Sequence, residues 1–253
     1  MFTFLSFGKT RPNLRRLFRK STPLQLLVIG YGLIVLIIAI LLSLPISSSN
    51  GTSQPFIDAL FIATSGISTS GLTVVDIGSF YSLFGQVILL IDFQIGGLGY
   101  MTFFAFIAYV LDRKLSLTSA IVAVESLAGP TLGDLKKFFR IVVLYTFVFE
   151  FIGAAILALY WMREFSILKA IYLGIFHSVS TFCTAGFALF PNSLMSYEGD
   201  IMINLLIDIL SLAGGISFFV LNDLYIFSKK TIKRLMDQCS LLIINPLLRQ
   251  SAF

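Results

Sequence analysis

Three long stretches of this 253-residue chain contain no lysine or arginine: residues 21–112, 141–162 and 170–228. A helix that crosses the hydrocarbon core of a bilayer needs about 20 mainly apolar residues, so each stretch can hold at least one span. Charged residues make up only 12% of the chain, whereas a soluble domain carries about 25%. The sequence therefore predicts an all-α, polytopic membrane protein.

Four long apolar segments are candidates for membrane spans, at residues 24–44, 82–111, 138–161 and 201–227. Two shorter apolar segments, at 55–66 and 166–180, would form helices only about 18–22 Å long, too short for a core of about 30 Å. Small and hydroxylated residues follow each short segment, and irregular backbone is tolerated at membrane depth only inside protein or beside water. We therefore expect each short segment to be a pore helix that leads into a re-entrant loop.

The basic residues indicate the orientation of these segments. Sixteen of the 18 fall in the N-terminal segment, in the loop between the second and third spans, or in the C-terminal tail. Only Arg163 and Lys169 fall on the other side. Because basic residues concentrate in cytoplasmic segments, both termini are expected in the cytoplasm and both re-entrant loops are expected to enter from outside. The net charge of +5 is explained by this topology, so we expect lipid contacts and no nucleic-acid partner.

The chain also contains an internal repeat. Residues 65–72 align with residues 180–187, which pairs Gly71 with Gly186 at an offset of 115. Both copies have the order span, pore helix, filter-like loop, span. The expected segments are a basic N-terminus at 1–23, a first repeat at 24–111, a linker with a short interfacial helix at 112–137, a second repeat at 138–228 and a cytoplasmic tail at 229–253.

The two loops have the composition of a cation filter. Backbone carbonyls can replace the water that a K⁺ ion loses in a pore, where glycine permits dihedral angles closed to other residues. The partly negative C-terminal ends of the short helices would favour a cation, and neither loop contains lysine or arginine. The candidate ion-binding residues are Ser68, Thr69, Ser70 and Gly71 in the first loop, and Cys183, Thr184, Ala185 and Gly186 in the second.

Glycine pairs and acidic residues within the predicted spans allow two interpretations. Gly96-Gly97 and Gly214-Gly215, which match at an offset of 118, suit close packing between helices better than ion binding. Asp92 and Asp208 are either part of the ion path or hydrogen-bonding groups that hold helices together.

The remaining reactive side chains do not form an enzyme site. His177 is the only histidine, and we interpret it as a hydrogen-bonded residue of the second pore helix rather than a metal ligand. Cys183 and Cys239 are too few for a disulfide framework, so both are expected to be reduced, with Cys183 an inert small residue of the loop. We expect no enzyme activity and no covalently bound cofactor.

Several motifs resemble the Trk/Ktr/HKT superfamily of potassium transporters, and the bacterial Ktr/Trk membrane subunit most of all. They cover most of the chain from residue 24 to residue 227. The matching stretches are 58–76, 84–86 and 94–99 in the first repeat, and 176–180, 183–187 and 190–194 in the second. The resemblance implies a filter glycine in each repeat, K⁺ uptake with Na⁺ as a coupling ion in some members, and a cytoplasmic nucleotide-binding regulatory subunit.

The chain departs from that family in three ways. Thr184 stands where the family usually has asparagine, and Gly66 where it usually has alanine. The family also has four repeats, so this chain resembles half of a four-repeat, potassium-channel-like pore, and the repeat that carries the gate is missing. A complete filter would then need a second copy or the missing half. The alternative is a truncated remnant that does not conduct, from a split, truncated or frameshifted gene.

Overall fold

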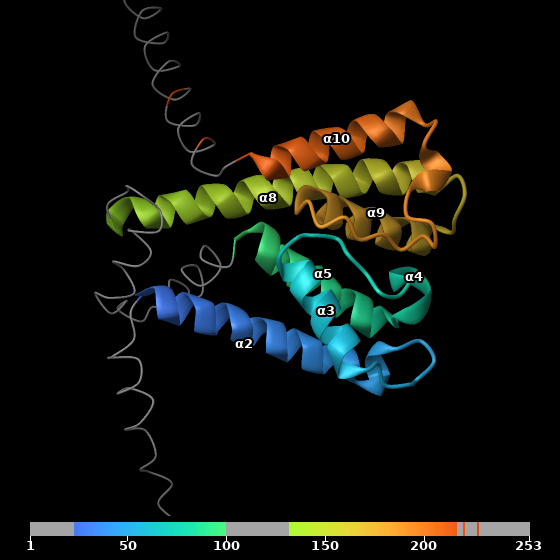
Figure 1. Cartoon of the computed structure of the whole chain (residues 1–253). Coiled ribbons are helices and arrows are strands. Elements are labelled where there is room, and N and C mark those ends of the chain that lie inside the picture. The colour runs from blue at the N-terminus through green and yellow to red at the C-terminus, as the bar shows by residue number, and fades with distance from the viewer. Residues whose placement is uncertain (1–22, 100–131, 217–219, 221–226, 228–253) are drawn as a thin grey trace, which may run out of the picture.

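The computed structural model describes residues 23–99, 132–216, 220 and 227 (Figure 1). Within these ranges the regular elements are helices, accompanied by one isolated antiparallel bridge between Ser48 and Tyr81. The predicted all-α class is confirmed. The N-terminal segment before residue 23, most of the expected linker and the tail lie outside the described residues.

Six main helices form two groups of three. Figure 1 shows α2, α3 and α5 together on one side and α8, α9 and α10 on the other. The bounds are α2 Pro23–Ser43, α3 Phe56–Ile67, α5 Leu83–Gly97, α8 Leu132–Trp161, α9 Ile167–Phe182 and α10 Ile201–Gly215. Short helices η1 (Pro45–Ser47), α4 (Ile77–Phe80) and η2 (Met195–Tyr197) lie in the connections.

Side-chain caps fix where the last helix of each group begins. The Ser82 hydroxyl accepts a hydrogen bond from the backbone N–H of Gly85 at the start of α5. The Asp200 carboxylate accepts one from Ile203 at the start of α10, and a second from the Tyr160 hydroxyl on α8 at 2.6 Å. Each cap satisfies a backbone donor that the first turn of a helix leaves free.

The ends of α5 and α10 differ from the sequence-based expectation. The predicted second and fourth spans were continuous to residues 111 and 227, but α5 ends at Gly97 and α10 ends at Gly215, each at the glycine pair. Ile216 is extended, with φ −68° and ψ 127°, so the chain leaves the helix there. A 15-residue helix is only about 22 Å long.

Within the described residues, one helix segment is long and apolar enough to cross a membrane, judged by length and composition. It is Arg140–Trp161 within α8, with 22 residues and a mean hydropathy of 2.3. α8 itself begins at Leu132, six residues before the expected start at 138. The other apolar helices in the described part of the chain are shorter.

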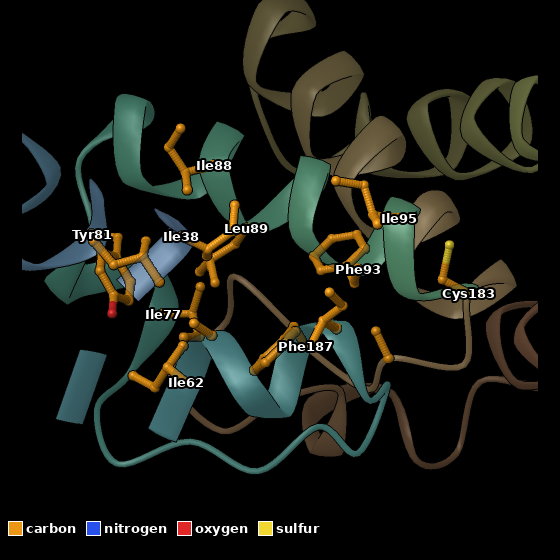
Figure 2. Close-up of a cluster of buried hydrophobic side chains, with 14 of the residues drawn as sticks. Ile38, Ile62, Ile77, Tyr81, Ile88, Leu89, Phe93, Ile95, Cys183 and Phe187 are labelled. Carbon is orange, nitrogen blue, oxygen red and sulfur yellow. The ribbon is translucent and has the colours of Figure 1, made fainter. Parts of the chain in front are cut away.

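The buried core joins the two groups of helices. Figure 2 shows Phe93 of α5 beside Phe187, which follows α9 in the chain. Phe93 also meets Phe176 of α9 edge to face, with ring centroids 5.6 Å apart. By contrast, α2 exposes a row of large apolar side chains, including Leu33, Ile37 and Ile40. Such a face is unusual in water and is suited to contact with lipid or another membrane segment.

Candidate functional site

The two loops that follow α3 and α9 have the same backbone conformation. Thr69 and Gly71 have positive φ angles of 52° and 74°, and Thr184 and Gly186 have angles of 54° and 73°. A positive φ is ordinary for glycine but uncommon for a β-branched residue such as threonine. The same exceptional pattern therefore occurs twice, at an offset of 115 residues.

The hydrogen bonds of the two loops follow the same rule. In both, three successive backbone N–H groups donate to carbonyls at the end of the preceding helix, at 2.8–3.0 Å. The donor and acceptor pairs are Ser68–Thr64, Thr69–Gly66 and Ser70–Ser65 in the first loop, and Cys183–Val179, Thr184–Thr181 and Ala185–Ser180 in the second. Every pair in the second loop lies 115 residues after its counterpart, so the internal repeat of the sequence is a repeat of backbone geometry as well.

The structure brings the two loops together at their glycines. A Cβ atom added to Gly71 would lie 2.6 Å from the carbonyl oxygen of Ala185, and one added to Gly186 would lie 3.5 Å from the Cα atom of Gly71. Ser68, Ser70 and Thr184 are exposed beside this junction. The two candidate loops, one from each group of helices, thus meet at this point.

Cys183 differs from the other candidate residues because its side chain points away from the exposed part of the loop. It is buried and unbridged, and its sulfur lies 4.0 Å from Glu150 Oε1. A Cβ atom on Gly97 would be only 2.6 Å from the same sulfur. The side chain of Cys183 is therefore a packing group between α5, α8 and α9. Its backbone belongs to the loop, where its carbonyl accepts the Thr184 hydroxyl at 2.7 Å.

A buried acidic side chain lies behind the first loop. Asp92 of α5 is 0% exposed, and neither of its carboxylate oxygens has a hydrogen-bond partner among the described residues. A Cβ atom on Gly66 would overlap Asp92 Oδ2. The glycine at position 66, where the resembling family usually has alanine, thus provides the space that the carboxyl group occupies.

A second buried acid lies beside the second loop, and sequence reasoning missed it. Glu150 of α8 accepts a hydrogen bond from Gln94 Nε2 of α5 at 2.8 Å, and its backbone carbonyl accepts the Ser178 hydroxyl at 2.7 Å. Glu150 is the only acidic residue of the third predicted span, and this feature of the sequence could have identified it as a candidate. The pair joins the two groups of helices directly next to Cys183.

The packing interpretation of the glycine pairs is confirmed for three of the four residues. A Cβ atom on Gly96 would overlap the carbonyl oxygen of Ile67, and one on Gly214 would overlap that of Phe182. These are the last residues of α3 and α9, so α5 and α10 hold the two helix ends in the same way. Gly97 contacts Cys183, whereas no described residue lies within 4 Å of a Cβ atom added to Gly215.

His177 is a hydrogen-bonded residue of the second pore helix, as predicted. It is 1% exposed. Its Nδ1 lies 2.8 Å from the carbonyl oxygen of Leu173, and its Nε2 accepts the backbone N–H of Leu189 at 3.2 Å. The ring therefore ties the chain that leaves the second loop back to α9. Asp208, in contrast to Asp92, lies on the exposed side of α10.

Known proteins resemble the chain over most of its length. It is 40% identical over 204 residues to the Ktr system potassium uptake protein B of Bacillus subtilis, covering 81% of this chain and 45% of that protein. It is 35% identical over 225 residues to the protein of the same name from Vibrio alginolyticus, covering 88% and 49%. It is 33% identical over 210 residues to the potassium/sodium uptake protein NtpJ of Enterococcus hirae, covering 83% and 47%.

The chain spans about half the length of these curated relatives. The TrkH family, described as "Cation transport protein", matches residues 20–248, which include both loops and all six main helices. The chain belongs to the TrkH family of cation transport proteins, a family of membrane proteins.

Proposed function

We propose that this chain carries K⁺ across the cell membrane along backbone carbonyls of the two loops that end at Gly71 and Gly186. The alternation of φ angles carries the proposal. In an extended strand, successive peptide groups point to opposite sides. Residues 69 and 71, and residues 184 and 186, have positive φ angles, and the residue between each pair has a negative one. Such alternation can turn successive backbone carbonyls to the same side, where they can coordinate a dehydrated cation.

The helices that precede the loops favour the same ion. α3 ends at Ile67 and α9 ends at Phe182, each directly before its loop. The C-terminal end of a helix carries about half a negative charge. Neither loop contains a basic residue that would repel a cation. We therefore assign the ion-binding role to residues 68–71 and 183–186.

The proposed architecture is two copies of a span, pore helix, filter loop and span, with re-entrant loops that enter from outside. Two loops meeting at Gly71 and Gly186 provide half of a ring, and carbonyl coordination around an axis needs about four. A second copy of the chain, or a separate half with two more repeats, would complete the pore. The coverage of about half of each relative supports this requirement.

Names of the relatives suggest two further features. One relative is named a potassium/sodium uptake protein, which supports Na⁺ as a coupling ion. Others are named as parts of a Ktr system, and we propose a cytoplasmic nucleotide-binding regulatory subunit that docks on the basic inner segments 1–23, 112–137 and 229–253.

Complementation tests whether the chain transports K⁺. Bacteria that lack K⁺ uptake should grow in low K⁺ when they express this chain together with the C-terminal half of a four-repeat relative. If the chain supports growth by itself, its mass in detergent should be that of a dimer. The alternative, a non-conducting remnant, predicts membrane insertion without uptake in either case. A stable monomer that carries K⁺ in reconstituted vesicles would contradict the proposed assembly.

Cysteine labelling tests the proposed topology. Asn50 is exposed in the connection between α2 and α3. In cells that express Asn50→Cys with Cys239 replaced by serine, a membrane-impermeant maleimide added outside should label the protein. The matched variant Ser116→Cys, in the expected cytoplasmic linker, should react only after the membrane is permeabilised. Labelling of position 50 from the inside alone would exclude this topology.

A further inference from the structure

Asp92 has no neutralising partner in the described part of the protein. Its two carboxylate oxygens are buried and make no hydrogen bond there. The side chains of Arg140, Arg163 and Lys169 are exposed. Lys169 Nζ lies over the Phe165 ring, 4.6 Å from its centroid. A buried carboxyl group without a partner is costly, and acidic residues inside membrane proteins commonly mark ion pathways.

The position of Asp92 connects it to the first loop. It lies against Gly66, whose carbonyl accepts the backbone N–H groups of Ser68 and Thr69. Only the backbone at the end of α3 therefore separates the carboxyl group from the loop. This helix end is itself partly negative, so the acid adds to a field that already attracts cations.

The position equivalent to Asp92 in the second repeat carries no acid; Glu150, the buried acid beside the second loop, comes from α8 instead. Gly96 and Gly214 make equivalent contacts with the ends of α3 and α9, and the residues four positions before them are Asp92 and Leu210. Leu210 is buried and lies against Gly153 of α8. The acidic group is thus a feature of one repeat only, and it depends on the absence of a side chain at position 66.

We propose that Asp92 is a further determinant of cation affinity: from its place behind Gly66, its carboxyl group attracts the ion that the first loop holds. The inference rests on the proposed function, because it requires that the loops bind a cation. It assigns Asp92 a positioning role through the electric field, without direct contact with the ion.

Titration of the K⁺-conducting assembly identified by complementation, with KCl in choline chloride buffer at pH 9 and followed by calorimetry, tests this inference. Asp92→Asn keeps the size of the side chain and removes the group that can ionise, so at pH 9, where a carboxyl group beside a bound cation carries its charge, K⁺ should bind about tenfold more weakly, as expected for a unit charge at a distance of about 10 Å. Asp208→Asn removes the same charge from the exposed side of α10 and should change K⁺ affinity by less than about twofold.

If Asp92→Asn binds K⁺ as tightly as the wild type, the inference is wrong and the proposed function stands. If the wild type binds no K⁺, both are overturned.

A second variant separates this role from a purely structural one. Gly66→Ala should displace the carboxyl group and weaken K⁺ binding, because the added Cβ atom would overlap Asp92 Oδ2. The double variant Gly66→Ala with Asp92→Asn should bind K⁺ no more weakly than Asp92→Asn alone. In a conducting assembly, Asp92→Asn should raise the KM for K⁺ about tenfold and leave the maximal rate unchanged. A lower maximal rate with an unchanged KM would indicate a structural role and would also overturn the inference.

Discussion

Gly71→Ala is expected to abolish the preference for K⁺ over Na⁺ in a conducting assembly and to remove most of the uptake. Gly71 has a φ of 74°, where an alanine is strained by about 1 kcal/mol. The added methyl group would also lie 2.6 Å from the carbonyl oxygen of Ala185 in the other loop. Relief of the strain and of the overlap requires rotation of carbonyls on both sides of the junction.

The measurement is ⁸⁶Rb⁺ uptake with and without competing Na⁺, alongside the amount of protein in the membrane. Gly186→Ala has a similar φ of 73°, but its methyl group would lie 3.5 Å from the nearest atom, so its effect should be smaller. Gly51→Ala is the matched control. Gly51 has a φ of 67° with nothing within 4 Å of an added Cβ atom, and it lies far from the loops in the sequence. If selectivity survived both loop substitutions, these loops would not be the filter.

The helices and the family could be predicted from sequence because their signals are local or are repeated in short motifs. Apolar segments predicted all six main helices, and the small and hydroxylated residues after the two short segments predicted where α3 and α9 end. The ends of α5 and α10 were missed because the apolar character of the chain continues past Gly97 and Gly215. Composition does not show that the backbone departs from a helix at a glycine.

The candidate site could be predicted only in part, since its contacts join distant residues. The residues of both loops follow from composition and resemblance. The bond between Gln94 and Glu150 links residues 56 apart, and no pattern in the sequence pairs them. The departures from the family acquire physical meaning only in the structure. Gly66 makes room for Asp92, and Thr184 holds a φ of 54°, a value that asparagine adopts more readily than threonine.

Gly214→Ala is expected to cause the largest loss of stability among substitutions of the glycine pairs. The added methyl group would overlap the backbone carbonyl of Phe182 at the end of α9, and a backbone atom cannot move aside as a flexible side chain can. α10 would have to shift away from the helix end that supports the second loop. We expect a loss of about 3 kcal/mol in the free energy of unfolding, with reduced K⁺ uptake because the loop loses its support.

Gly215→Ala provides the control for Gly214→Ala, one residue further along the same helix. Among the described residues, nothing lies within 4 Å of a Cβ atom at position 215, and its φ is not positive. Alanine favours a helix over glycine by up to about 1 kcal/mol, so this variant should be neutral or slightly more stable. Thermal unfolding of both variants in detergent, followed by circular dichroism, measures the difference. Equal melting temperatures for the two variants would show that the close approach of α10 to Phe182 does not stabilise the fold, and that the support of the second loop comes from elsewhere.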